Sequence, residues 1–466
     1  MQFDRRRFLR GSLITLGSLA ARFDAAAQAE GAAKAGAEVT TFTADVTPPP
    51  GEPLGFTDAP TRVVEHPLLA KGIVLRDAGG TYVLCALDWC EIHNGSYELF
   101  RQKIAKAART SPSRVAVQTL HQHTAPAYDT EAQQILNKIQ AASPWKGLEF
   151  LEEAATQTAA AVEKATAQWK SLTHVGTSWA SVDQVASSRR IQQPDGTILG
   201  RMSSATDPEQ QKAPEGAIDG YLRTLTFFNS GTPVVRAHYY ATHPQTYYRD
   251  GRVTYDVPGI ARKRLEKESG VFQVYFTGCG GDIGMGKYND GTPARRPALV
   301  DRLYDGMVRS IKDVHVEPVS RLQWTTVDVR FPLRSDEAFS EEASRKILAD
   351  GKAPAFAAFN AAWVLAQVAR AKADRPFQLS CLTIGSSRIL HLPGEPFVEY
   401  QLYAQRLRPK LFVAVAGYGD CGTGYICTDR AYSDKGGYEQ TESFIGPSEK
   451  LLKEALARLI TDTPAA

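Results

Sequence analysis

The chain has 466 residues, of which 43% are hydrophobic and 23% are charged, and its formal net charge at pH 7 is +3. These values are those of an ordinary globular protein with a sizeable core. Lys and Arg are scattered along the chain instead of forming a clustered basic face, which argues against a nucleic-acid partner.

The N-terminal segment has the features of an export signal. Arg5, Arg6 and Arg7 precede an apolar stretch at residues 11–21, and Ala27-Gln28-Ala29 fits a cleavage site. The arginines indicate the twin-arginine type, and an apolar stretch of about eleven residues is too short for a membrane anchor. We therefore expect a periplasmic or secreted protein with no transmembrane segment in the mature chain. The expected divisions are a signal peptide at 1–29, a disordered leader at 30–37 and one domain at 38–466.

The first part of the mature chain alternates strands with helices. Runs of β-branched and apolar residues predict strands at 38–46, 72–76, 81–88 and 115–120. Helical periodicity predicts a helix at 97–109, between the last two of these strands. The strand at 115–120 leads directly into His121 and His123.

The rest of the chain continues this pattern. Helices are predicted at 144–169, 259–267, 296–313, 337–371 (interrupted near 351–354) and 447–460. Strands are predicted at 222–229, 233–240, 272–276, 320–332, 378–384, 388–392 and 411–416. Residues 185–220 are polar, with a turn at 194–196. Because no linker follows residue 38, we expect an α/β fold of mixed α+β type, a single large domain with mixed β-sheets flanked by helices.

Several of the predicted strands end in side chains that can bind a metal. These side chains are His121, His123, His243, Glu395 and Tyr425. Ligands and reacting groups collect at strand ends in α/β sheets, and imidazole, carboxylate and phenol donors suit Zn²⁺. Each residue alone also has a structural interpretation: hydrogen-bonded histidines, a carboxylate in a turn and a core aromatic.

Five blocks of sequence, in order between residues 38 and 460, carry a family resemblance. They are 83–126 with His121-Gln-His-Thr-Ala-Pro126, 238–244 with His243-Pro244, Pro393-Gly-Glu395, Gly424-Tyr425, and Tyr438-Glu439. This ordered set resembles the neutral ceramidase family. The resemblance implies a neutral-ceramidase-like catalytic domain in which one zinc ion is held by His121, His243, Glu395 and Tyr425. It makes His123 an imidazole that supports a ligand or faces the substrate, and His123 in place of His121 as the ligand stays open.

Two features depart from the pattern of that family. Where the family has a nucleophilic serine in a Gly-Asp-Val-Ser-Pro-Asn run, this chain has Gly284, within Gly281-Asp-Ile-Gly-Met-Gly286. The C-terminal immunoglobulin-like domain of the family is not expected here. We therefore expect direct hydrolysis by metal-bound hydroxide instead of a covalent serine mechanism.

Other residues near the predicted centre are candidates for roles in the reaction. His123 and Asp282 are candidates for moving the proton, and Tyr438 for donating to the developing oxyanion. The backbone N–H groups of Gly280 and Gly281 would form an anion-binding nest. The alternative for these glycines is a tight structural turn.

The leading functional hypothesis is an exported zinc-dependent hydrolase of an amide (N-acyl) or related bond. Its substrate would be a small molecule derived from a lipid or a sugar. One alternative is a hydrolase of carbohydrate-derived substrates, because five aromatic residues in loop-like segments could stack on sugars: Tyr128, Trp145, Tyr247, Tyr248 and Tyr255. The other alternative is a binding protein that keeps the metal without catalysis.

The six cysteines contain no CxxC pair, so a cysteine zinc site is not expected. They are Cys85, Cys90, Cys279, Cys381, Cys421 and Cys427. An oxidising compartment permits disulfides, but twin-arginine cargo folds before export, so buried free thiols and disulfides both stay open. Cys279 would act as a nucleophile only with a depressed pKa and an adjacent base.

Overall fold

The computed structural model describes residues 36–55, 60–139, 147–248, 250–350 and 352–461. The first of its large sheets has the strand order β6-β4-β3-β1-β8. These strands are β1 (Glu38–Asp45), β3 (Leu69–Asp77), β4 (Gly80–Leu87), β6 (Val115–Thr119) and β8 (Lys170–Ser171). Strands β4 and β6 are parallel and are joined through α1 (Asn94–Ala107), whereas β1–β3 and β3–β4 are antiparallel.

Each of the other two large sheets also ends in a pair of parallel strands that are joined through a helix. Their strand orders are β16-β14-β13-β9-β18 and β19-β20-β21-β23. One edge combines β14 (Thr232–Tyr240), α5 (Asp256–Ser269) and β16 (Phe272–Thr277); the other combines β21 (Ser387–His391), α9 (Val398–Leu407) and β23 (Phe412–Ala416). The remaining strands are β9 (His174–Ser181), β13 (Tyr221–Asn229), β18 (His315–Pro318), β19 (Leu322–Val329) and β20 (Phe377–Ile384).

The three parallel edges meet at the carboxyl ends of β6, β16 and β23. Thr277 donates from Oγ1 to the carbonyl of Leu120 at 2.8 Å, and Gly417 donates from N–H to the carbonyl of Thr277 at 2.9 Å. The side-chain amide of Gln118 donates to carbonyls of the third sheet, including that of Gly417 at 2.8 Å. Since strand carboxyl ends are where α/β folds bind ligands, this junction brings three such ends together.

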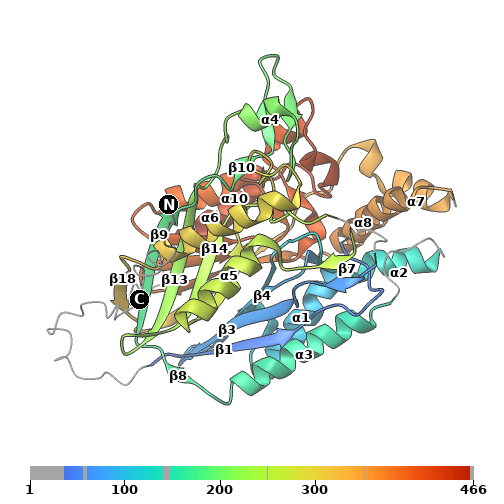
Figure 1. The fold of residues 1–466 in the computed structure, drawn as a ribbon. Helices are drawn as coiled ribbons and strands as arrows, with labels where there is room; N and C mark the ends of the chain where they lie inside the picture. Colours follow the sequence, from blue (N-terminus) through green and yellow to red (C-terminus); the bar gives the residue numbers. More distant parts are fainter. Residues whose placement is uncertain (1–35, 56–59, 140–146, 249, 351, 462–466) are drawn as a thin grey trace, which may run out of the picture. The chain divides into compact units, whose positions relative to one another are not determined.

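Helices cover the outer faces of these sheets, and apolar side chains fill the space between them. Figure 1 shows α1 and α3 along the first sheet and α5 and α6 along the second, in agreement with their contacts. Ile73 and Leu75 of β3 belong to a core shared by all three sheets, whereas Val74 belongs to the core under α1 and α3. A strand that is buried on both faces appears in the sequence as a continuous apolar run. The other α-helices are α2 (Thr130–Lys138), α3 (Glu149–Ala165), α4 (Pro208–Lys212), α6 (Arg296–Arg309), α7 (Glu341–Ala349), α8 (Ala355–Lys372) and α10 (Glu449–Thr461).

Short strand pairs complete the fold near the junction. They are β2 (Val63–Val64) with β15 (Arg252–Val253), β5 (Glu91–His93) with β7 (Ala127–Asp129), β10 (Ser187–Ser188) with β17 (Ile283–Gly284), β11 (Arg190–Gln192) with β12 (Ile198–Gly200), and β22 (Glu395–Pro396) with β24 (Tyr425–Ile426). Three of these pairs, β5–β7, β10–β17 and β22–β24, carry residues of the candidate site described below.

The predicted fold class is confirmed: mixed sheets are flanked by helices, and the described residues form one compact unit. The helix expected over 337–371 is indeed interrupted and forms α7 and α8. Strand β9 and helices α2 and α9 were not predicted. The expected signal peptide lies outside the described residues. Within the described part no helix is long and apolar enough to cross a bilayer, and all six cysteines are buried free thiols.

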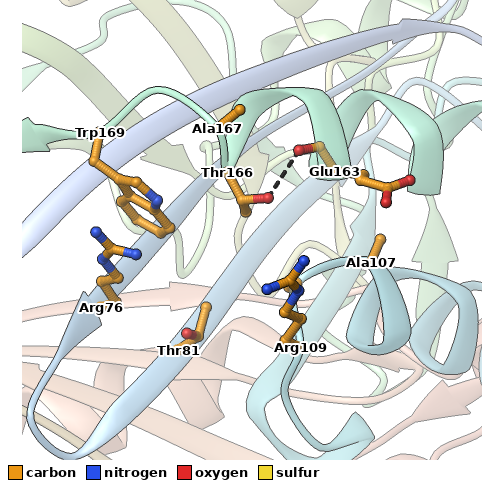
Figure 2. Close-up of a pocket in the computed structure, with 9 residues that line it drawn as sticks. Arg76, Thr81, Ala107, Arg109, Glu163, Thr166, Ala167 and Trp169 are labelled. Atoms are coloured by element: carbon orange, nitrogen blue, oxygen red, sulfur yellow. Dashed lines mark hydrogen bonds between the residues drawn. The ribbon is translucent and has the colours of Figure 1, made fainter.

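A surface cavity of about 350 Å³ lies at the far end of the first sheet (Figure 2). The guanidinium of Arg76 lies 4.1 Å above the ring of Trp169 and pairs with Glu38 at 2.6 Å. Arg76 is paired with Thr81 at the end of β3–β4 opposite Leu87. The cavity is therefore remote from the junction of the three sheets. Its lining residues are Arg76, Thr81, Ala107, Ala108, Arg109, Glu163, Thr166, Ala167 and Trp169.

Candidate metal centre

The backbone turns sharply where the predicted donor residues leave their strands. His121 follows β6 with a φ of 64°, a left-handed conformation that is uncommon for residues with a side chain. Its N–H donates to the carbonyl of Trp89 at 3.0 Å, and the N–H of His243 donates to that of Ile283 at 2.9 Å. Glu395 and Tyr425 start β22 and β24 as a paired position, so both lie side by side.

Three donor atoms converge on one buried point. Nε2 of His121 lies 3.1 Å from Oε2 of Glu395, and Nε2 of His243 lies 3.0 Å from the same oxygen. The exposed fractions of the three residues are 2%, 5% and 1%. Nε2 of His121 and Oε2 of Glu395 are buried without an aligned hydrogen bond among the described residues. Unpartnered donors aimed at a common point fit a bound cation, and the nitrogen and oxygen set fits zinc.

The opposite nitrogens of both imidazoles are held by the surrounding chain. Nδ1 of His243 lies 2.6 Å from the carbonyl of Gly280, an acceptor that fixes the proton on Nδ1 and leaves Nε2 unprotonated. Nδ1 of His121 lies 3.2 Å from the carbonyl of Cys90 and 3.2 Å from Oε1 of Glu91. This is the arrangement found around metal-binding histidines.

Burial and neighbouring charges keep both His243 and Glu395 unprotonated at their donor atoms. Burial, with the charges of Arg189 and His121, lowers the pKa of His243 to about 4. Burial opposes ionisation of Glu395, but the two adjacent imidazoles outweigh it and hold its pKa well below the usual range. At neutral pH His243 is therefore a neutral nitrogen donor and Glu395 an anionic oxygen donor.

His123 lies beside the same point and leaves a second donor set open. Its ring centroid is 5.0 Å from that of His121 and 6.0 Å from that of His243. Burial and these two imidazoles lower the pKa of His123 well below its usual value. Its Nε2 is buried and has no aligned hydrogen-bond partner in the part of the chain that the structure describes. Cys90, His121 and His123 form a second group with donor atoms within 4.8 Å of one another. The group that contains His243 and Glu395 includes His121 and not His123.

Tyr425 approaches the centre together with an arginine that the sequence did not reveal. The phenol oxygen of Tyr425 lies 3.5 Å from Nε2 of His243. Arg189 donates from Nη1 to this oxygen at 3.0 Å, and the same nitrogen lies 3.2 Å from Nε2 of His243. Arg189 follows β10 inside the polar region 185–220. The adjacent pair Arg189-Arg190 is the feature of that region that could have indicated a functional arginine.

The loop that contains Gly280 and Gly281 positions two of the donor residues, His243 and Glu395. The carbonyl of Gly280 accepts from His243, and the N–H of Gly281 donates to the carbonyl of Pro396 at 3.0 Å. A Cβ on Gly281 would collide with the carbonyl oxygen of Glu395. The N–H of Gly281 is therefore already used inside the protein, and the contacts of this loop are those of the tight-turn alternative.

Asp282 and Cys279 are also engaged in the scaffold. Oδ1 of Asp282 accepts from the N–H of Val398 at 2.8 Å, where a carboxylate stabilises the start of α9. Burial and the nearby Glu399 raise the pKa of Asp282 well above its usual value. Burial likewise raises the pKa of Cys279 well above that of a free thiol, which makes it a poor nucleophile.

Tyr438 lies at the edge of the centre. It is 37% exposed, and its ring centroid is 6.0 Å from that of Tyr425. The guanidinium of Arg189 lies 5.5 Å from the centroid of the Tyr438 ring. Tyr438 is therefore placed where an incoming molecule can meet both Arg189 and Tyr425.

The aromatic residues considered for sugar stacking serve mainly as packing. Tyr128, Tyr247 and Tyr255 are buried, with exposed fractions of 1%, 5% and 2%. Tyr248 is half-buried and donates from its hydroxyl to the carbonyl of Gln245 at 3.2 Å. Trp145 lies outside the described residues. Buried rings cannot stack on a ligand, so these contacts do not support the carbohydrate alternative.

Comparison with solved structures identifies the fold. The chain is similar to a neutral ceramidase from Pseudomonas aeruginosa, with a TM-score of 0.68, 15% identity, and coverage of 93% of this chain and 76% of that one. It is also similar to a structure described as a ceramidase complexed with C2, with a TM-score of 0.66, 15% identity, and coverage of 92% and 77%. The fold is neutral-ceramidase-like. No protein-family model matches the sequence, and no curated protein does.

Proposed function

We propose that this chain is an exported zinc-dependent hydrolase that cleaves an amide (N-acyl) bond in a lipid-derived or related small molecule. The observation that carries the proposal is the approach of two imidazole Nε2 atoms to Oε2 of Glu395 at 3.0 and 3.1 Å. The neutral-ceramidase-like fold supports the bond type and the lipid class, because both similar structures are ceramidases.

His121, His243, Glu395 and Tyr425 would hold one zinc ion, with His123 as the alternative to His121. Bound zinc lowers the pKa of a water molecule to about 7 and polarises a carbonyl oxygen. Tyr425 is protonated without the metal, because burial raises its pKa well above that of an ordinary phenol. Its coordination therefore requires loss of a proton, so that binding of the metal becomes stronger as the pH rises.

The chain supplies the remaining chemistry. Nε2 of His123 has no aligned hydrogen-bond partner among the described residues and would accept the proton from the attacking water. Arg189 and Tyr438 lie together at the edge of the centre and would donate to the developing oxyanion. Asp282, Gly280 and Gly281 would support the loop that positions the donors.

Substitution of two donors tests the centre. We expect His121→Ala and Glu395→Gln to lose bound zinc and hydrolysis while keeping the fold. His315→Gln is a matched control, because His315 is an exposed histidine of β18, remote from the donors. Zinc would be measured by elemental analysis, and hydrolysis with N-acyl lipids, N-acyl sugars and small amides. Absence of near-stoichiometric zinc from the wild-type protein would refute the metal centre.

The same substrate panel decides between the hydrolase and its alternatives. Turnover of N-acyl sugars alone would favour the carbohydrate alternative, and zinc binding without turnover of any substrate would favour the binding protein. Because Gly284 offers no nucleophile, we expect mass spectrometry of the protein during turnover to show no covalent adduct. An acylated protein would overturn the proposed mechanism.

Export can be tested separately on the full chain. We expect Arg6→Lys combined with Arg7→Lys to retain the protein in the cytoplasm, because the twin-arginine pathway reads the arginine pair. Fractionation of bacterial cells that produce either version provides the measurement. Equal periplasmic recovery of both would argue against this export route.

A further inference from the structure

A line of buried charged and polar groups runs from His121 through Glu91 and His93 to Asp129. Oε1 of Glu91 lies 3.2 Å from Nδ1 of His121, and Oε2 of Glu91 lies 2.6 Å from Nε2 of His93. Nδ1 of His93 lies 3.7 Å from Oδ2 of Asp129. Strands β5 and β7 hold this order, because they pair in parallel with His93 opposite Asp129.

The far end of this line is fixed in the scaffold. Oδ1 of Asp129 accepts from the N–H groups of Glu131 and Ala132 at 2.9 and 3.0 Å, so that Asp129 caps helix α2. Oδ2 of Asp129 accepts from Nδ2 of Asn94 at 3.1 Å. The ring of His93 stacks on Trp363 of α8, with centroids 5.6 Å apart and an interplanar angle of 5°.

The position of Glu91 is not explained by the scaffold alone. Its exposed fraction is 5%, and burial of a carboxyl group is expensive unless it is paired and hydrogen-bonded. Helix α2 is capped by Asp129 and requires nothing from Glu91. Both carboxyl oxygens of Glu91 instead contact imidazoles, one of which points its other nitrogen at the donor cluster.

We propose that Glu91, held by His93 and Asp129, is a positioning residue that orients His121 for metal binding. An oxygen acceptor beside Nδ1 favours the proton on that nitrogen, directs Nε2 at the metal and makes the imidazole a stronger donor. The proposal rests on the zinc centre proposed above. It adds that the affinity of this centre depends on residues that touch neither the metal nor the substrate.

Zinc affinity, measured by competition with a chelator, tests this role independently of turnover. We expect Glu91→Ala to weaken zinc binding by about 10- to 100-fold, the range typical of such supporting groups. The carbonyl of Cys90 would then remain as an acceptor for Nδ1 of His121 at 3.2 Å. Glu91→Gln keeps an oxygen acceptor for His121 and should retain more affinity than Glu91→Ala.

A matched control separates orientation from general charge. Glu442 is a largely buried acid near Glu395 whose carboxyl is bonded to Asn360. Glu442→Gln removes another acidic group near Glu395 without touching His121. We expect a loss in affinity smaller than that of Glu91→Ala, and an unchanged absorption spectrum of the cobalt-loaded protein. Glu91→Ala and Glu91→Gln should both alter that spectrum, because the donor strength of His121 changes.

The possible results are distinguishable. If the wild-type protein binds no zinc, the proposed function fails. If it binds zinc and Glu91→Ala keeps its affinity within twofold with the wild-type cobalt spectrum, the positioning role is overturned. A loss for Glu442→Gln as large as that for Glu91→Ala would overturn it as well. Should Glu91→Ala not fold, an unchanged cobalt spectrum for Glu91→Gln would overturn the role and a changed one would support it.

Discussion

Arg189 donates from Nη1 to the phenol oxygen of Tyr425 at 3.0 Å, with the same nitrogen 3.2 Å from Nε2 of His243. A guanidinium opposes the binding of a cation nearby, yet it stabilises negative charge that develops in a reaction. We infer that Arg189 serves the reaction more than retention of the metal.

Arg189→Gln should therefore keep bound zinc and lower kcat by about 100-fold, the scale for loss of one oxyanion donor. Kinetics and elemental analysis on the same preparation provide the measurement. Arg190→Gln is the control, because Arg190 pairs with Glu439 at 2.6 Å and Asp434 at 2.9 Å and is expected to affect stability only. Loss of zinc from Arg189→Gln would contradict the assignment.

Two donor sets share His121, one with Cys90 and His123 and the other with His243 and Glu395. They lead to different predictions. Burial and the charges of Glu91 and Glu395 raise the pKa of Cys90 well above that of a free thiol, which disfavours the thiolate needed for coordination. Cys90→Ser should therefore leave zinc stoichiometry and the cobalt spectrum unchanged, whereas His243→Ala should abolish both. A sulfur-to-cobalt charge-transfer band that disappears in Cys90→Ser would favour the set containing Cys90.

Gly281→Ala tests the role of the glycine loop in positioning Glu395. The added Cβ would collide with the carbonyl oxygen of Glu395, so the loop must shift. We expect a loss of about 1–3 kcal/mol in the free energy of unfolding, together with weaker zinc binding. Gly200→Ala is the control, because no heavy atom lies within 4 Å of its added Cβ. Denaturant unfolding would measure both variants, and equal behaviour would refute the prediction.

The buried His238 should make the fold sensitive to mild acid. Its ring contacts Oγ1 of Thr224 at 2.8 Å and Oε1 of Gln273 at 2.7 Å, and burial lowers its pKa to about 3. As the pH falls below 6.5, the imidazole of His238 therefore takes up a proton in the unfolded chain but stays neutral in the folded chain. This contribution is complete above pH 6.5 and is lost as the pH falls toward 3.

Between pH 7 and pH 5 the loss from His238 amounts to about 2 kcal/mol. His238→Gln, which has no titrating group, should show a correspondingly smaller decrease in the free energy of unfolding over this range. Urea unfolding at both pH values provides the measurement. An identical pH dependence for wild type and variant would exclude His238 as the source.

The strands that lead into the donors were accessible from the sequence because they carry runs of β-branched and apolar residues. The run at 115–120 ends one residue before His121, and β6 ends at Thr119. The strand at 233–240 corresponds to β14, which ends three residues before His243. In contrast, the adjacency of Glu395 and Tyr425 depends on the β22–β24 register, and two-residue strands leave no periodic signal.

The supporting residues were beyond the reach of sequence patterns. Glu91 begins the three-residue strand β5, and Arg189 lies between the short strands β10 and β11. Both acquire their roles from residues far away in the chain, such as His121 and Tyr425. The N–H of Gly281 was expected to bind an anion, but it donates to Pro396 across more than a hundred residues. Such partners follow from tertiary pairing, which propensity and local spacing do not encode.

His121 and His243 follow strands of the first and second sheets, and Glu395 and Tyr425 lie in the β22–β24 pair. The donors therefore extend from residue 121 to residue 425 of the chain. A chain in which β22 and β24 have not yet paired lacks Glu395 and Tyr425 beside the imidazoles, so its ligand set is incomplete for tight zinc binding. Uptake of the ion would therefore be one of the last events of folding. In a cell, metal content would then distinguish finished molecules from incomplete ones before they meet a substrate.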